Sequence, residues 1–319
     1  MVTGFLFPAG GIRAADLGLQ TLTTTGIFII SGLSLKQGEA RDAISAWPAV
    51  LYGVVSILFI TPLAALLAMR LPLQPPALAF GLAVFCCMPT TLSSGVALTQ
   101  AVGGNTALAL LLTVGTNLLG IFTMPFVLCN LLGTGSGTVA LSPGPLLRSL
   151  IKTILVPLLC GAAARQYIPG VAKAVDGNKR ALSMLSAVLL SLVPWMQISR
   201  AVTSDVAVSV GALVAVVAAG VAIHLLYLAF NTAAVRALGI GGRSGPQAVA
   251  IQRALVLVGS QKTLPIAVVV LNSCTAILGS SVGLAVIPCV GSHLLQILVD
   301  SILVSAWLRS DRIAAGRES

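Results

Sequence analysis

Charged and aromatic side chains are scarce in this sequence. Only 8% of its 319 residues are charged and 5% are aromatic, whereas 57% are hydrophobic and the mean hydropathy is +1.04. A chain of this length cannot hide so much apolar surface in one water-soluble core. Lipid must therefore solvate much of it, and the composition argues against a soluble enzyme.

The long apolar runs also lack the alternation of apolar and polar residues that barrel strands require. They are continuous over ~20 to 25 residues, the length that a helix needs to cross ~30 Å of hydrocarbon. In hydrocarbon only helices and closed barrels satisfy every backbone polar group. The sequence therefore predicts an all-α polytopic membrane protein.

Apolar length, together with the positions of Pro, Gly and charged residues, predicts nine full spans in a single integral membrane domain, residues 1–319. The predicted spans are 16–35, 46–69, 77–102, 106–132, 145–166, 179–201, 205–235, 247–272 and 281–308. The apolar opening at residues 1–11 is too short to span, and indicates a stub, a re-entrant piece or the end of a truncated first helix. No basic region precedes it, which argues against a cleaved signal peptide.

The net charge of +10 does not indicate nucleic acid, because no basic stripe with interleaved aromatics is present. Lys and Arg instead follow the topology of a membrane protein, in which they accumulate in cytoplasmic loops. One set of predicted loops holds eleven of them and the opposite set holds five. This asymmetry places the C-terminus in the cytoplasm or the stroma, for a protein of the plasma membrane or the plastid envelope.

Motifs of catalysis and metal binding are absent from the sequence. It contains no CxxC pair, Walker loop, HExxH or paired carboxylates. The six cysteines fall mostly inside apolar runs, as small packing residues do. No catalytic residue, metal site or cofactor is therefore predicted, and any transport would draw on a gradient or on no energy source.

Two predicted spans contain polar and helix-breaking residues at corresponding places in the two halves, at 86–97 and 256–267. Pro89 and Pro265 each remove a backbone donor, and the carbonyls left free in hydrocarbon need partners. Paired broken helices are typical of secondary-transporter binding sites, although Pro kinks and Ser or Thr packing give the alternative interpretation. The candidate substrate and ion ligands here and on the following helix are Thr90, Thr91, Ser93, Ser94, Gly95, Thr113, Asn117, Ser260, Gln261, Lys262 and Thr263.

Lys262 is a charged residue near the middle of an apolar span, where it costs several kcal/mol unless it is paired or hydrated. We expect it to face a cavity; the alternative is an internal ion pair with Asp300. His293, Gln296 and Asp300 recur at i, i+3 and i+7, so they form a supporting polar face that should look into the protein.

His224, Tyr227 and Asn231 share a second face in the same way and predict a hydrogen-bonded packing seam between helices. One His and one distant carboxylate are too few ligands for a transition-metal site.

Several of these segments resemble the bile acid:sodium symporter (BASS, SBF-like) family, in its solute-carrier-seven-like branch, and the resemblance runs almost end to end. The specific segments are Ile30-Ser-Gly-Leu-Ser-Leu-Lys36, Cys87-Met-Pro-Thr-Thr-Leu-Ser-Ser-Gly-Val96, Gly104-Asn-Thr-Ala-Leu-Ala109 and Gly259-Ser-Gln-Lys262. The resemblance implies two inverted five-helix repeats, here residues 1–132 and 145–308. It also implies a panel and a core domain, with helices four and nine broken and crossing at the site. Phe7-Pro8 would end a truncated helix one.

The family's sodium ligands would fall on Ser94, Gly95, Ala109, Thr113, Ile57, Leu257, Gln261 and Lys262. Of these positions, Ser94, Thr113 and Gln261 would still offer a sodium ion a side-chain oxygen. Expected ligand positions such as Ile57 and Leu257 are aliphatic, which argues against sodium coupling because Na⁺ prefers hard oxygen ligands. Our hypothesis is that the Lys262 ammonium takes the place of the missing cation charge, by holding the crossing together or by pairing with an anionic substrate.

The sequence as a whole predicts a BASS-like secondary transporter that moves a small organic anion or metabolite by alternating access. The alternative is a transport-inactive membrane regulator that retains the fold and has lost the ion site. An intramembrane enzyme lacks a nucleophile and base pair. The predicted partners are the substrate and the lipid bilayer, and no oligomeric state is predicted.

Overall fold

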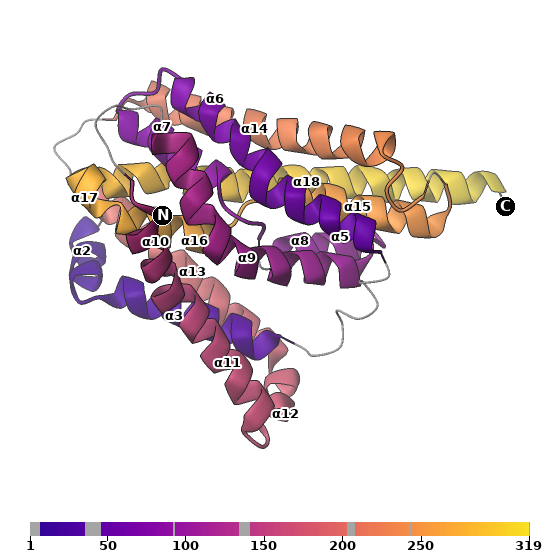
Figure 1. Ribbon diagram of the computed structural model, residues 1–319, viewed down its shortest axis with the longest axis horizontal. Coiled ribbons are helices and arrows are strands. Elements are labelled where there is room, and N and C mark those ends of the chain that lie inside the picture. The colour runs from indigo at the N-terminus through magenta and orange to yellow at the C-terminus, as the bar shows by residue number, and fades with distance from the viewer. Residues whose placement is uncertain are drawn as a thin grey trace.

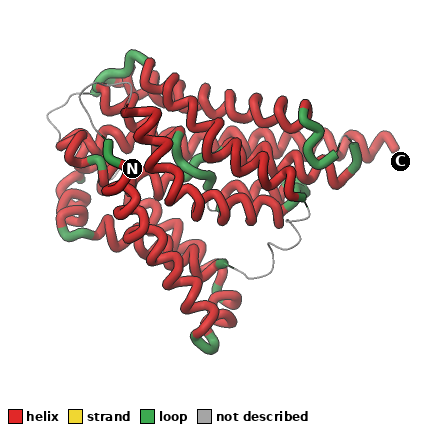
Figure 2. Tube along the Cα trace, in the orientation of Figure 1, coloured by secondary structure: helices red, strands yellow, loops and turns green. Residues whose placement is uncertain are grey.

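The computed structural model describes residues 7–35, 46–91, 93–133, 141–202, 208–242 and 244–318. Throughout those ranges every regular element is helical, as the sequence predicts (Figures 1 and 2). The first half forms α2 (Pro8–Asp16), α3 (Leu19–Ser34), α5 (Trp47–Val55), α6 (Ala64–Arg70), α7 (Pro76–Cys86), α8 (Ser94–Ala101) and α9 (Thr106–Gly133). The second half forms α10 (Pro143–Leu150), α11 (Val156–Tyr167), α12 (Val171–Gly177), α13 (Lys179–Val202), α14 (Val210–Ala237), α15 (Pro246–Ser260), α16 (Leu264–Ser273), α17 (Thr275–Leu278) and α18 (Val282–Glu318).

Seven helical segments in the described residues are long and apolar enough to cross a membrane, or eight if α2 and α3 form one span bent by 74°. The protein is therefore a multi-pass membrane protein. The predicted span 77–102 is divided into α7 and α8, and neither piece is long enough to cross alone. Nine full spans require α7 and α8 to be counted as one, so the number nine stays a prediction.

The start of the chain differs from the expected end of a truncated helix. Pro8 occupies the first turn of α2, so a helix begins here. Proline is suited to that position because the first turn of a helix leaves its N–H groups unpaired in any case. Residues 1–6, which carry most of the predicted stub, lie outside the described residues.

Two helices contain a π-helical turn that precedes a proline. Ser56–Ile60 forms such a turn between α5 and α6, with Pro62 two residues later, and Ile151–Leu155 forms one between α10 and α11, with Pro157 two residues later. The proline removes one N–H from the helical ladder, and wider winding redistributes the carbonyls that have lost their donor. The turn at 56–60 exposes a carbonyl that becomes important at the site.

The helices fall into two packed groups. α2, α3, α11, α12 and α13 pack against one another, and we call them the side unit; α5–α10 with α14–α18 form the larger core unit, in which α10 packs on α9 and α16. Figure 1 shows α3, α11 and α12 extending away from the rest of the molecule. In the side unit the two helices α3 and α11 approach closely at Gly32 and Gly161, where an added Cβ would lie 2.0 and 2.2 Å from a backbone oxygen of the facing helix.

Burial separates the helices that carry the site from those that face lipid. The most apolar stretch of Pro246–Ser273 is entirely buried, whereas that of Val210–Ala237 is 28% buried. Large apolar side chains such as Leu225 and Leu226 on α14 point outward, as expected for a helix against lipid. The second broken span thus lies at the centre of the molecule, and the first is buried from Gly81 to Thr91.

Candidate functional site

The two broken spans cross at their breaks, as expected from their paired positions in the sequence. The Thr263 amide donates a hydrogen bond to the Pro89 carbonyl oxygen (3.0 Å), and the Thr90 hydroxyl donates to the Val258 carbonyl oxygen (2.6 Å). Each break therefore supplies partners for backbone groups that the other leaves free. The break predicted around Pro265 lies just before it, because residues 261–263 are extended and α16 begins at Leu264.

Gln261 joins the two breaks through its side chain, which is completely buried. Its Oε1 accepts hydrogen bonds from the hydroxyls of Thr91 (2.5 Å) and Ser94 (2.9 Å) on the first broken span. Its Nε2 donates to Asp300 Oδ2 on α18 (2.6 Å). The Thr91 oxygen also accepts from the amide of Gly95, in the first turn of α8 (3.1 Å).

The predicted polar face of α18 supports the second break. Gln296 pairs with the backbone of Lys262 as a neighbouring strand would, since its Oε1 accepts from the Lys262 N–H (2.9 Å) and its Nε2 donates to the Lys262 carbonyl oxygen (2.7 Å). His293 Nδ1 lies 3.2 Å from the same carbonyl oxygen. This face therefore holds the extended residues in place, besides binding Gln261 through Asp300.

The predicted seam on α14 contacts the same break. His224 Nε2 lies 2.8 Å from Asp300 Oδ1, and its Nδ1 lies 3.2 Å from the Ser260 carbonyl oxygen. Asn231 donates to the Ser260 hydroxyl (3.1 Å) and accepts from Tyr52 and Ser56 at 2.8 Å each. The seam thus supports the break itself as well as the packing of helices.

Lys262 does not pair with Asp300, so that alternative from the sequence is wrong. Its Nζ donates to the Ile57 carbonyl oxygen (3.1 Å) and to the Thr61 hydroxyl (2.8 Å), both at the π-helical turn. The ring of Tyr227 lies below it, 5.6 Å from Nζ to the ring centroid. With an exposed fraction of 1%, Lys262 reaches neither solvent nor the large cavity described next; the cavity that it lines is a small enclosed one of about 10 Å³, shared with Tyr227 and Gln296.

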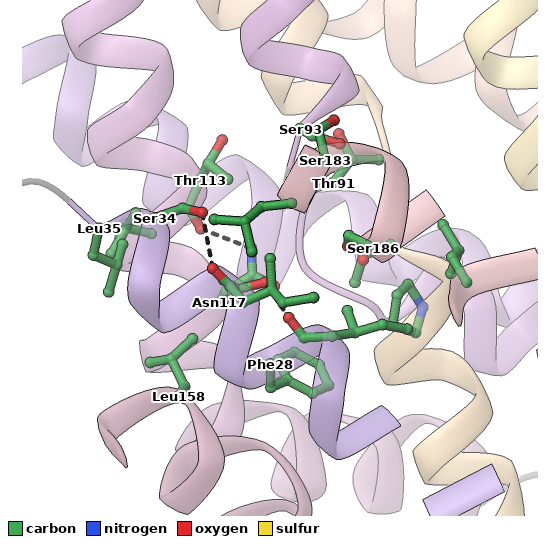
Figure 3. A pocket seen from close by; sticks show the side chains of 18 of the residues that line it. Phe28, Ser34, Leu35, Thr91, Ser93, Thr113, Asn117, Leu158, Ser183 and Ser186 are labelled. Atoms are coloured by element: carbon green, nitrogen blue, oxygen red, sulfur yellow. Dashed lines mark hydrogen bonds between the residues drawn. The ribbon is translucent and has the colours of Figure 1, made fainter. Parts of the chain in front are cut away.

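A cavity of about 580 Å³ lies between the side unit and the crossing. Figure 3 shows side chains of α3 (Phe28, Ser34), α9 (Thr113, Asn117) and α13 (Ser183, Ser186) around it. Of the residues predicted from the sequence, those that line the cavity are Thr91, Ser93, Ser94, Thr113, Asn117, Thr263, Pro265 and His293. The others, which are absent from its lining, are Pro89, Thr90, Gly95, Ser260, Gln261, Lys262, Gln296 and Asp300.

Two oxygen atoms of α9 stand out at this cavity. Thr113 Oγ1 and Asn117 Oδ1 are buried and have no hydrogen-bond partner in the described residues. The Asn117 amide nitrogen, in contrast, donates to the Thr90 and Thr113 carbonyl oxygens (3.0 and 2.7 Å), which fixes the side chain. An orphaned buried oxygen is costly, so a polar ligand that donates hydrogen bonds would stabilise this wall.

The side-unit wall was missed by the sequence reasoning. Ser31 and Ser34 on α3 and Ser183 and Ser186 on α13 line the cavity, each pair at i, i+3 spacing inside an apolar span. That spacing was a readable signal, since it places both hydroxyls of a pair on one helix face. Arg165 also lines the cavity and pairs with Asp176 at 2.8 Å; Lys179 lies 3.7 Å from the same carboxylate.

Sodium fits these residues poorly. Of the three side-chain oxygens expected to bind it, those of Ser94 and Gln261 are hydrogen-bonded to each other, and only Thr113 Oγ1 lacks a partner. Leu257 is completely buried and offers no side-chain oxygen, while the Ile57 carbonyl is occupied by the Lys262 ammonium. Sodium binding therefore has no part in the mechanism proposed below.

Comparison with known proteins identifies the family. The SBF-like CPA transporter family model matches residues 2–309. The protein named "Probable sodium/metabolite cotransporter BASS4, chloroplastic" of Oryza sativa subsp. indica is 47% identical over 308 residues, which cover 96% of this chain and 72% of that protein. Its namesake in Arabidopsis thaliana is 45% identical over 307 residues, covering 96% and 70%.

A more distant relative, "Sodium/bile acid cotransporter 7-A" of Xenopus laevis, is 33% identical over 162 residues, or 50% of this chain and 46% of that protein. These proteins are named as transporters and not as enzymes, and their names give no support to a transport-inactive regulator. The chain therefore belongs to the SBF-like CPA transporter family, within the bile acid:sodium symporter group that its motifs predict.

Proposed function

We propose that this chain carries a small organic anion across a membrane by alternating access. The observation that carries the proposal is the 580 Å³ cavity, which lies between two packed helical units and touches both helix breaks. Cavities of about 300 to 1,000 Å³ suit small organic ligands. Its place between the units means that a movement of one unit against the other would open it to either side, as in other transporters with broken central helices.

Helix ends and charges favour an anion. α8 begins at Ser94 and α16 begins at Leu264. Ser93 and Ser94 at the first N-terminus and Thr263 at the second line the cavity. Helix N-termini carry partial positive charge and free N–H groups, which stabilise anionic groups. The lining also includes two cationic side chains, Arg165 and Lys179, against one carboxylate, Asp176. The apolar part of a substrate would rest against Phe28 and its aliphatic neighbours.

The relatives and the charge pattern support one choice of membrane and orientation. The plant relatives are named chloroplastic, which supports a plastid envelope over the plasma membrane. With more Lys and Arg predicted on the side of the C-terminus, that end would face the stroma.

Uptake into proteoliposomes tests the proposal. Vesicles loaded with unlabelled small carboxylates, phosphates or sulfonates should take up the labelled counterpart of at least one class. Asn117→Ala should raise the half-saturating concentration about tenfold, because it removes an amide worth roughly 1 to 2 kcal/mol at the cavity wall. Thr123→Ala is the matched control, since Thr123 lies on α9, is partly exposed, and within the described residues bonds only to the Leu119 carbonyl oxygen of its own helix. Equal uptake by the two variants and the wild type would reject this cavity as the site.

A further inference from the structure

The cavity carries a cluster of charged side chains at the end away from the helix breaks. Arg165 lies in the last turn of α11, Asp176 lies on α12, and Lys179 is the first residue of α13. All three line the cavity, whose other end reaches Thr91 and Thr263 at the breaks. The side chains of Asp176 and Lys179 are 40% and 58% exposed, so the cluster lies at the mouth of the cavity. Figure 1 shows α11 and α12 at the tip of the side unit.

Arg165 is held in place by two hydrogen bonds that leave part of its guanidinium unused. Its Nη1 donates to the Leu33 carbonyl oxygen (3.0 Å), in the last turn of α3, and its Nη2 donates to Asp176 Oδ2 (2.8 Å). A guanidinium has more N–H donors than these two bonds use, and the rest have no partner within the described residues. The side chain is 13% exposed and lines the cavity. A carboxylate, phosphate or sulfonate group suits such a planar set of donors.

The charges around this mouth favour anions. Residues 165–180 contain four cationic side chains and one carboxylate, Asp176. α13 begins at Lys179 and has no acidic residue in its first turn, so the partial positive charge of its N-terminus is not offset there. Lys179 and Leu182, both in that first turn, line the cavity. A mouth with an excess of positive charge attracts anions and repels cations.

The Asp176 carboxylate binds the two cations as the anionic group of a substrate would. Its Oδ2 accepts from Arg165 at 2.8 Å, and its Oδ1 lies 3.7 Å from the Lys179 ammonium. Ion pairs that are this exposed contribute little to stability, so the energetic cost of separating Asp176 from either cation is small. An anion that enters the mouth can therefore displace Asp176. When the anion moves inward, Asp176 can pair with the cations again, which keeps the anion from being trapped at the mouth.

We propose that Arg165 and Lys179 form an entry site for the anionic group of the substrate, and that Asp176 competes with the substrate for both cations. The entry site lies on the side of the membrane where the Lys and Arg count predicts the C-terminus. Passage of the anion from this site to the helix breaks rests on the proposed transport function, whereas the binding of an anion at Arg165 does not.

Chemical modification of the purified full-length chain tests the entry site without transport. Phenylglyoxal reacts with accessible guanidinium groups, and mass spectrometry measures the rate of modification at each arginine. Sulfate, phosphate or acetate should slow the modification of Arg165 at least about threefold relative to chloride at equal ionic strength, as expected for a site that is mostly occupied. Arg148, an exposed arginine on α10 outside the cavity lining, is the internal control and should react equally fast in every salt. Equal rates at Arg165 in all four salts would overturn the entry site.

Removing the charge of Asp176 tests the competition. Asp176→Asn keeps the shape of the side chain, so the half-saturating concentration for anion uptake should fall about threefold to tenfold at low ionic strength, and the difference from the wild type should shrink as salt is added. Asp16→Asn is the matched control, because Asp16 also forms an exposed ion pair with an arginine, Arg200 at 3.1 Å, and does not line the cavity. An unchanged or raised half-saturating concentration in Asp176→Asn would overturn the competition and assign the carboxylate to the stability of the turn between α11 and α13.

A second pair of variants tests Lys179. Lys179→Gln should raise the half-saturating concentration, whereas Lys173→Gln, an exposed lysine on α12 that is absent from the cavity lining, should leave it close to the wild-type value. Equal effects of the two variants would show a diffuse surface charge and would overturn the assignment of Lys179. Absence of uptake for every anion would reject the transport function, while the modification rates at Arg165 would still decide whether an anion binds at the mouth.

Discussion

Replacing Lys262 by Met tests whether its charge serves stability or transport. Methionine has nearly the length and apolar stem of lysine, so packing in the fully buried site is preserved. The substitution removes the hydrogen bonds to the Ile57 carbonyl and the Thr61 hydroxyl and the contact with the Tyr227 ring. Both oxygens keep a partner, since the Thr61 hydroxyl donates to the Ser56 carbonyl at 2.9 Å and also lies 3.2 Å from the Ile57 carbonyl oxygen.

The energetic terms of this substitution oppose each other. A hydrogen bond to a charged group contributes about 1.5 to 3 kcal/mol, and a desolvated cation–π contact about 2 kcal/mol, so the ammonium gains roughly 5 to 8 kcal/mol from its contacts. Removing an ammonium from water costs several kcal/mol even after the protein relaxes. No described carboxylate pairs with it to lower that cost. We therefore expect Lys262→Met to change the free energy of unfolding by less than ~2 kcal/mol.

Anion binding should respond more strongly than stability. A unit charge acting across roughly 10 Å at an effective dielectric constant of 20 contributes about 1.7 kcal/mol, or roughly a 15-fold change in affinity. Thermal unfolding in detergent and the half-saturating concentration for uptake measure the two effects separately. Lys152→Met, an exposed lysine at the other π-helical turn, is the matched control. A loss of more than ~4 kcal/mol of stability would show that the contacts outweigh the desolvation cost and would refute the reasoning.

Two further substitutions test the architecture around the crossing. An added Cβ at Gly81 on α7 would lie 1.8 Å from the Ala285 backbone oxygen of α18, so Gly81→Ala should lower the midpoint of thermal unfolding, whereas Gly115→Ala, which meets open space, should not. Equal midpoints for these two variants would contradict the close packing of α7 on α18. Gln296→Ala removes the acceptor of the Lys262 N–H and one of the donors to the Lys262 carbonyl oxygen. We expect the free energy of unfolding to fall by about 2 to 4 kcal/mol and amide exchange at residues 261–263 to become faster. Exchange as slow as in the wild type would show that Gln296 is not what holds the break.

The helix breaks could be predicted because their signal is local. Pro89 and Pro265 stand in apolar runs beside Ser, Thr and Gln, and a helix in hydrocarbon tolerates such residues only where partners exist. The same local chemistry explains why the predicted span limits lie within five residues of the helix ends at most of the described spans. A break within 77–102 was expected, but its length was not. Seven residues separate α7 from α8, and of these Leu92 lies outside the described set.

The direction of the buried side chains could not be predicted, because it depends on which elements surround the crossing. Sequence spacing places Lys262 and Asp300 in neighbouring spans but does not say on which side of the backbone each points. In the folded chain Gln261 turns towards Asp300, and Lys262, one residue later in extended backbone, points to the opposite side. Successive side chains of an extended backbone point to opposite sides, so Lys262 points away from Asp300, although both lie in neighbouring spans of the sequence.

Three of the residues at the sodium positions implied by the resemblance, Ile57, Leu257 and Lys262, can be related through the geometry of the crossing. Where the resemblance places a side-chain ligand, the chain has Ile57, whose backbone carbonyl binds the Lys262 ammonium at a turn opened by Pro62. An ammonium fixed on that carbonyl repels any free cation from it, so an oxygen-bearing side chain at position 57 would have no ion to bind. The same argument applies to Leu257, which is fully buried. A carboxylate at position 257 would need a bound cation to neutralise its charge. These contacts support the hypothesis that the Lys262 ammonium takes the place of a bound cation, in which case Ile57 and Leu257 need no side-chain oxygen. Restoring sodium dependence would accordingly require changing all three positions, and we expect any single reversal to destabilise the protein without making uptake respond to sodium.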